Sequence, residues 1–144
     1  MGSQIHTYTF NASLEVLEEI RNLISQKGNE HGYSKKEIYN LTLAVDEIAT
    51  NIINHGYIEK GIKKGTFNML IELHEKQLIV RLVDGAVPYN PIDQNLPSEE
   101  LLNTPLEDRP IGGLGIMIAK QSVDEFKYEF IEGKNNNIFV VNKK

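Results

Sequence analysis

The first residues that could do chemistry are Glu47, Asn51 and Asn54, in a segment with helical periodicity. At about 100° per residue their side chains lie close together on one helix face, beside the apolar stripe, and Asp46 points away from them. An amide oxygen can ligate a hard cation such as Mg²⁺, and a carboxylate can orient or deprotonate a hydroxyl. The alternative is a solvated helix edge. His55 could be a metal ligand or a base, although an interaction with the helix C-terminus is the more common role.

A second candidate is Asp84, which follows an apolar run typical of a buried strand and precedes Gly85 and Ala86. A carboxylate at the end of a central strand can accept a hydrogen bond from an amino group in a pocket. The small residues after it leave room for a flat ligand. Because Asp-Gly is a common turn pair, a simple turn is the alternative.

A third candidate is the pair Gly113 and Gly115, at the predicted start of a helix. Helix N-termini expose free amides and hold phosphates, and glycines let the phosphate approach the backbone. Arg109 could pair with a phosphate. The alternatives are a loop-to-helix turn and a solvated arginine. The segment lacks the lysine and the spacing of a Walker P-loop or a dinucleotide fingerprint.

These residues need strands and helices to position them. Ser34 and Glu37 form a capping box before the strongest helical pattern, which runs from about residue 35 to about 55. Alternation of apolar and polar residues predicts a strand at 4–10. The other patterns predict a helix capped by Asn11 or Ser13 that fades near Gly28, strands at 67–73 and 78–83, a helix from 114 to about 123, and strands at about 124–131 and 137–142, joined by a turn at 133–136.

This order of elements predicts an α+β fold: a two-layer sandwich with helices on one face of a mixed, mostly antiparallel sheet. The length of 144 residues suits a single domain over 1–144. The segment from about 85 to 112 holds all five prolines, and only Ser98 to Asn103 could form a short helix. We interpret this segment as a lid, because the glycine and acidic candidates lie at its two ends. A wandering surface loop is the alternative.

Composition narrows the class of protein. The net charge of −5 argues against nucleic acid or anionic membrane as a direct partner. The absence of cysteine excludes disulfides, zinc–thiolate sites and a cysteine nucleophile, and it fits a reducing cytoplasm. No apolar run reaches membrane-spanning length, and the first residues do not form a secretory signal. We therefore expect a cytoplasmic protein.

The candidates occur in a specific order along the chain: Glu-x-x-x-Asn on a helix, Asp-Gly-Ala after a strand, a long lid and a Gly-x-Gly helix start. This order resembles the Bergerat ATP-binding fold of the gyrase, chaperone and histidine-kinase superfamily. The closest resemblance is to its small anti-sigma-factor serine kinases, which act in bacterial partner-switching systems. Residues 43–57 resemble their N box, 84–91 their first glycine box and 109–116 their second, so the similarity covers essentially the whole chain.

The resemblance implies a role for each candidate. Glu47 would be the general base and Asn51 the Mg²⁺ ligand, while Asp84 would contact the adenine amino group. Ala86 departs from the usual Asp-x-Gly pattern but is small enough for nucleotide binding. The implied cofactor-binding residues are Asn51, Asp84, Ala86, Arg109, Gly113, Leu114 and Gly115, the last three through their backbone amides.

The resemblance further implies that the chain uses ATP, ADP and Mg²⁺ and phosphorylates a serine or threonine of a small anti-sigma-factor antagonist. It also allows a sigma factor as partner and a homodimer. One alternative is a non-catalytic module that switches partners by its nucleotide state, and retention of Glu47 favours the kinase over it. Another is a kinase-like domain cut from a larger sensor. The lack of a phosphoacceptor-histidine helical domain and an end directly after the last strand speak against that expectation.

Overall fold

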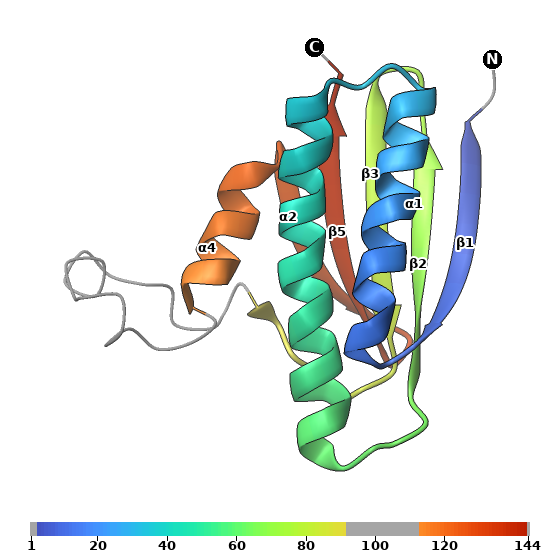
Figure 1. The fold of residues 1–144 in the computed structure, drawn as a ribbon. Coiled ribbons are helices and arrows are strands. Elements are labelled where there is room, and N and C mark those ends of the chain that lie inside the picture. Colours follow the sequence, from blue (N-terminus) through green and yellow to red (C-terminus); the bar gives the residue numbers. More distant parts are fainter. Residues whose placement is uncertain (1–2, 92–112, 144) are drawn as a thin grey trace, which may run out of the picture.

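The computed structural model describes residues 3–91 and 113–143 (Figure 1). Their regular elements largely follow the predicted order. Those elements are β1 (Gln4–Asn11), α1 (Leu17–Glu30), α2 (Lys35–Asn51), β2 (Thr66–Leu73), β3 (Gln77–Asp84), α4 (Gly113–Ser122), β4 (Glu125–Ile131) and β5 (Lys134–Asn142). The short helix predicted at 98–103 and most of the predicted lid lie outside the described residues.

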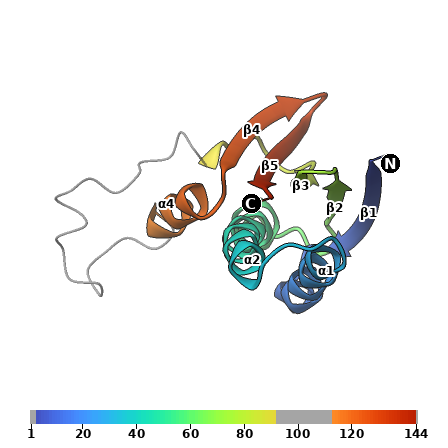
Figure 2. The same cartoon turned by 90° about the horizontal axis from the view of Figure 1, so that it is seen from above.

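The strands form one sheet in the order β1-β2-β3-β5-β4, and α1 and α2 cover one face of it (Figure 2). The predicted two-layer α+β architecture is confirmed. All four pairings between the described strands are antiparallel. The sheet of the described strands is not mixed, because β5 inserts between β3 and β4, which run in the same direction and would otherwise pair in parallel.

The core lies between this sheet and the two long helices. Ile20 and Ile24 on α1 and Leu41 and Ile48 on α2 are fully buried in it. The members of each pair are one or two helical turns apart, so each helix presents one apolar stripe to the sheet. The inward side chains of the central strands complete the core: Phe67, Met69, Ile71, Leu78, Val80, Leu82 and Phe139.

The start of α2 is fixed by the predicted capping box. The Ser34 hydroxyl accepts a hydrogen bond from the Glu37 backbone N–H at 3.1 Å, and the Glu37 carboxylate accepts one from the Ser34 N–H at 2.8 Å. For the preceding helical segment, Ser13 is the cap: its hydroxyl accepts from the Glu15 N–H at the 3₁₀ turn Leu14–Val16 that leads into α1. Both caps satisfy amides that a helix start leaves without partners.

The other end of α2 differs from the prediction of a plain helix to about residue 55. The α-helix ends at Asn51 and continues as a π-helical turn, Ile52–Tyr57, followed by the 3₁₀ turn Ile58–Lys60. The Tyr57 hydroxyl donates to the Thr66 carbonyl at 2.9 Å, and a Cβ at Gly65 would lie 2.1 Å from the Tyr57 ring. The π turn is thereby tied to the start of β2. Such turns widen a helix and are frequent at functional sites.

The last hairpin is tighter than predicted. Glu132 and Gly133 have φ values of 50° and 78°, and β5 begins directly afterwards at Lys134. Two central residues with positive φ are typical of the turns that join two-residue hairpins. The predicted turn through residue 136 is therefore wrong, and the asparagines at 135 and 136 belong to the strand.

No helix within residues 3–91 and 113–143 has both the length and the apolar character needed to cross a bilayer.

Candidate functional site

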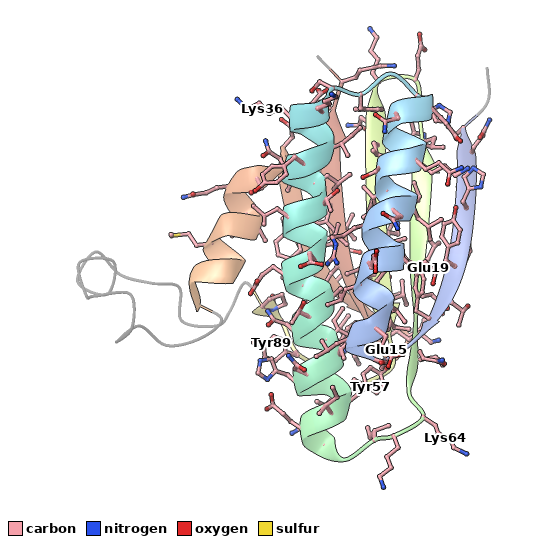
Figure 3. All side chains as sticks on the ribbon, in the orientation of Figure 1. Glu15, Glu19, Lys36, Tyr57, Lys64 and Tyr89 are labelled. Carbon is pink, nitrogen blue, oxygen red and sulfur yellow. The ribbon has the colours of Figure 1, made fainter. Side chains whose placement is uncertain are left out.

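A cavity of about 240 Å³ lies between the C-terminal end of α2 and the strands β3 and β5. A cavity of roughly 150 Å³ already admits a benzene ring, so this one has room for a flat heterocycle. Figure 3 shows Tyr57 and Tyr89 toward this end of α2, away from Lys36 at its start. The described residues that line the cavity are Ile48, Asn51, Ile52, His55, Gly56, Glu59, Lys60, Asp84, Ala86, Val87, Tyr89, Pro91, Asn135 and Asn137.

The carboxylate of Asp84 forms part of the cavity wall at the end of β3 and is only 4% exposed. Its Oδ1 accepts two hydrogen bonds, from the Ala86 N–H at 3.0 Å and from Asn135 Nδ2 at 2.9 Å. Both of its hydrogen bonds to described residues go to this one oxygen, which leaves Oδ2 as an acceptor for a ligand. Burial raises the pKa of the Asp84 carboxyl, and these two hydrogen bonds oppose the rise.

Asn135 holds the turn that follows β3. Its Nδ2 also donates to the carbonyls of Ala86 at 3.2 Å and Val87 at 3.0 Å. Its Oδ1 accepts from the Tyr89 N–H at 3.1 Å and from the Tyr128 hydroxyl. One buried amide therefore fixes the backbone from residue 86 to 89, which frames one side of the cavity.

The opposite wall comes from α2, where Asn51 is 9% exposed. Its Nδ2 is buried without a hydrogen-bond partner in the described part of the chain. This nitrogen is a donor and cannot ligate a cation, so the atom of Asn51 that could do so is Oδ1. Mg²⁺ bound together with phosphates needs only one or two protein oxygens, and Asn51 Oδ1 is of the type that this ion accepts.

His55, on the π-helical turn, lies beside Tyr89 from the opposite wall. The two rings stack with centroids 6.0 Å apart and an angle of 22° between their planes. His55 Nδ1 also lies 2.8 Å from the Glu59 carboxylate. His55 also lies in the last turn of the π-helical continuation of α2, at the helix end where the sequence predicted it. Both His55 and Tyr89 line the cavity.

Glu47 lies one helical turn before Asn51 and is half-buried, but it does not line the cavity. Burial raises the pKa of the Glu47 carboxyl, and the neighbouring Asp46 charge adds to the rise. Asp46 itself is directed toward α1, where it pairs with Arg21 at 2.6 Å, as its predicted orientation requires. Asn54 is half-buried and also lies outside the cavity lining.

The other predicted phosphate-binding residues belong to the second half of the chain. Gly113, Leu114 and Gly115 form the first turn of α4, so the predicted glycine-containing helix start is confirmed. Arg109 lies outside the described residues. The structure thus brings together Asn51, Asp84 and Ala86 of the predicted set in one cavity.

Sequence reasoning missed two asparagines of the cavity, Asn135 and Asn137. Both lie on β5, whose side chains at alternate positions point to the same face. Asparagine is depleted in strands, so three in succession before the apolar run at 138–141 were a usable signal. His55 and Tyr89 lie in segments 43–57 and 84–91, which resemble family motifs. Their stacking could not be predicted, because it depends on the tertiary fold.

Comparison with known proteins places this geometry in a family. Residues 10–141 match the family model of the histidine kinase-like ATPase domain. Serine-protein kinase RsbW of Bacillus cereus is 26% identical over 124 residues, which cover 85% of this chain and 75% of that protein. Anti-sigma F factor of Clostridium acetobutylicum is 28% identical over 108 residues, covering 75% of this chain and 71% of that protein.

A solved structure supports the same fold. The crystal structure of the RsbU and RsbW domains of a Mycobacterium tuberculosis protein matches with a TM-score of 0.66 at 15% identity. The match covers 98% of this chain and 33% of that longer one. The predicted similarity to anti-sigma-factor kinases is confirmed by these relatives, and the chain belongs to the histidine kinase-like ATPase domain family.

Proposed function

We propose that the chain is a single domain that binds ATP and ADP in the cavity between α2, β3 and β5. The observation that carries this proposal is the buried Asp84 carboxylate in a cavity wide enough for a base, with one oxygen held by Asn135. The other oxygen would accept a hydrogen bond from the adenine amino group. The family match and the names of the relatives support the same ligand class.

The phosphates would lie along α2 and the first turn of α4. Asn51 would supply an oxygen to Mg²⁺, and the amides of Gly113, Leu114 and Gly115 would hold phosphate oxygens. Arg109 would add a positive charge. Mg²⁺ held there would supply charge neutralisation for the transferred phosphoryl group.

We further propose that the chain is an anti-sigma regulatory serine/threonine kinase whose substrate is a small antagonist protein, with a sigma factor as a second partner. The names of the relatives, serine-protein kinase and anti-sigma F factor, support this assignment. Glu47 would accept the proton of the attacking hydroxyl. Its raised pKa suits a general base better than an ordinary surface glutamate, because base strength increases with pKa.

A second candidate function is a nucleotide-dependent switch without catalysis. The position of Glu47 outside the cavity lining is the observation that favours it. In that case ATP and ADP would change partner affinity, and no phosphate would move.

One experiment separates the two functions. Proteins that bind the chain are captured from a lysate of the source organism in the presence of Mg-ATP, identified, purified and incubated with the chain and labelled ATP. A kinase produces phosphoserine or phosphothreonine on a partner. Nucleotide-dependent capture with no labelled partner supports the switch. Failure of calorimetry to detect ATP or ADP binding would reject both.

A further inference from the structure

Tyr57 is a buried polar residue near the cavity that none of the proposed roles uses. It is 5% exposed and does not line the cavity, and it is the last residue of the π-helical turn that follows α2. Figure 3 labels it toward the same end of α2 as Tyr89. Its hydroxyl contacts two other elements, the start of β2 and the segment that follows β3. Because a buried hydroxyl has to find its partners within the protein, these contacts are part of the fold.

The first contact is with the start of β2. The Tyr57 hydroxyl donates a hydrogen bond to the Thr66 carbonyl at 2.9 Å. Thr66 directly precedes Phe67, which lies opposite Asp84 in the last described residue pair at this end of the β2–β3 ladder. The hydroxyl therefore lies at the end of the ladder where the proposed base-binding carboxylate is located.

The second contact is with the segment that follows β3. Burial raises the pKa of the Tyr57 hydroxyl, the Asp84 charge adds to the rise, and a hydrogen bond with the Gly85 backbone opposes it. A hydrogen bond that lowers the pKa of a phenol comes from a donor, which on the Gly85 backbone is the N–H. One hydroxyl thus donates to the backbone of β2 and accepts from the backbone that follows β3.

The Gly85 backbone in turn determines how the Asp84 carboxylate is held. The next amide along the chain, the Ala86 N–H, donates to Asp84 Oδ1 at 3.0 Å. A shift of the backbone at residue 85 would move that amide and turn the carboxylate. Asn135 holds the backbone from residue 86 to 89, so residue 85 lies between the end of β3 and a segment that is already fixed.

The aromatic ring that carries the hydroxyl is itself confined. A Cβ at Gly65 would lie 2.1 Å from the Tyr57 ring, so the ring fills the space that a side chain at position 65 would need. Gly65 is also held, because its carbonyl accepts a hydrogen bond from the Ala12 N–H at 2.9 Å. A side chain that is locked by packing and by hydrogen bonds is suited to keep a functional group in place.

We propose that Tyr57 is a positioning residue for adenine specificity: its hydroxyl holds the backbone at Gly85 so that Asp84 Oδ2 meets the exocyclic amino group of the base. This inference rests on the proposed nucleotide site, in which Asp84 accepts that N–H. The π-helical turn then has a role, because it brings a phenol from the α2 segment to the end of β3. Loss of the hydroxyl should weaken the contact with the amino group and leave the other nucleotide contacts in place.

The test compares two ligands by calorimetry. They are ADP and purine riboside diphosphate, which differs from ADP only by lacking the exocyclic amino group. The proteins are the parent, Tyr57→Phe, Gly65→Ala, Asp84→Asn and the double variant that combines Tyr57→Phe with Asp84→Asn. The matched control is Tyr39→Phe, which removes the hydroxyl of an α2 tyrosine that is 65% exposed.

Tyr57→Phe is expected to bind ADP about fivefold more weakly than the parent, which corresponds to the loss of one hydrogen bond. Its affinity for purine riboside diphosphate should change by less than about twofold, and Tyr39→Phe should match the parent with both ligands. In the Asp84→Asn background, Tyr57→Phe should weaken ADP binding by less than about twofold, because the group that the hydroxyl positions has been replaced. A merely structural tyrosine would not give an amino-specific loss that depends on Asp84.

Gly65→Ala approaches the same question without removing the hydroxyl. The added Cβ forces the Tyr57 ring to move, so this variant should also lose affinity for ADP and keep its affinity for purine riboside diphosphate. It decides the question by the same comparison if Tyr57→Phe does not fold.

Three results would overturn the inference. One is an ADP affinity of Tyr57→Phe equal to that of the parent, another is equal weakening for both ligands, and the third is an undiminished loss in the Asp84→Asn background. Each of these leaves the proposed nucleotide site in place, provided that the parent binds ADP and that Asp84→Asn weakens this binding. Absence of ADP binding by the parent rejects the proposed function itself, and this inference with it.

Discussion

Asn135 Nδ2 donates a hydrogen bond to Asp84 Oδ1 across the β3–β5 pair at 2.9 Å, between residues directly opposite each other in the register. The same amide holds the backbone of residues 86–89. Orientation of the carboxylate and shape of the following turn are therefore coupled through one side chain. An isolated Asp-Gly turn could not provide this coupling.

Replacing Asn135 with alanine should reduce both stability and nucleotide affinity. The change removes one of the two hydrogen bonds to Asp84 Oδ1, which keeps only the Ala86 N–H, and it removes the asparagine partner of the Tyr89 N–H. We expect the free energy of unfolding to fall by about 3 kcal/mol and ADP to bind at least tenfold more weakly. Urea denaturation and calorimetry measure the two effects. Asn136→Ala, which removes one hydrogen bond to the Lys134 carbonyl, is the control, and equal effects of both variants would contradict this role.

Replacing Glu47 with glutamine should abolish phosphoryl transfer and leave ADP affinity unchanged. Loss of a general base lowers the rate by about 10²–10⁴-fold. Asp46→Asn is the matched control, because its carboxylate pairs with Arg21 and should not be needed for transfer. The readout is labelled phosphate on the partner protein. Undiminished transfer by Glu47→Gln would remove this residue from the mechanism.

The stability of Glu47→Gln relative to the parent should depend on pH. Because the folded state raises the pKa of Glu47, this group contributes less stability as pH rises from its ordinary value of 4.5 through the folded value. At pH 7 the glutamine variant should be as stable as the parent or more stable. The difference should shrink as pH falls toward 4, where the parent carboxyl is protonated. Melting curves between pH 4 and 8 test this, and a parent that gains relative stability with rising pH would contradict it.

Gly56 and Ala86 face each other across the cavity wall. A Cβ at Gly56 would lie 3.0 Å from the Ala86 Cβ, which is too close for an ordinary contact. Gly56→Ala should therefore weaken ADP binding and lower stability by about 1–2 kcal/mol. The double variant with Ala86→Gly should recover most of both losses. Gly85→Ala, where a Cβ meets nothing within 4 Å, is the control, and a double variant no better than Gly56→Ala would contradict the contact.

Asp84 should make ADP affinity depend on pH. Burial raises the pKa of its carboxyl above the ordinary value of 3.8, so acidification should protonate it, and weaken ADP binding, at a higher pH than for an exposed aspartate. Asp84→Asn should bind ADP more weakly at pH 7 and lose this dependence. Calorimetry from pH 4.5 to 7.5 compares the two proteins. A parent that binds ATP and GTP equally well would contradict the proposed contact with adenine.

The sequence was sufficient for most of the fold because its periodic patterns are local. Apolar stripes at helical spacing and the box formed by Ser34 and Glu37 specify the helices without knowledge of their neighbours. The error at the β4–β5 turn had a physical cause, since asparagines favour turns when they have no partner. Asn135 stays in the strand because Asp84 on β3 and the turn after it supply partners that lie far away in sequence.

The candidate site was only partly predictable for the same reason. Asn51 and Asp84 belong to short motifs. Spacing alone left a solvated helix edge and a simple turn open, and the resemblance to a known family selected these two residues. The widened turn at Ile52–Tyr57 has no signature in a pattern read at 3.6 residues per turn. It is this turn that carries His55 to Tyr89, and pairing of β3 with β5 adds Asn137 to the wall. These relations arise only when the layers pack.

The place of β5 in the sheet has a consequence for biosynthesis. It is the last described strand to leave the ribosome, yet it lies between two strands that precede it. Until it docks, β3 keeps an open edge, and the wall that holds Asp84 is missing. A nascent chain that ends before Lys134 therefore has no base-binding wall, and nucleotide can bias folding only at the final strand-insertion step.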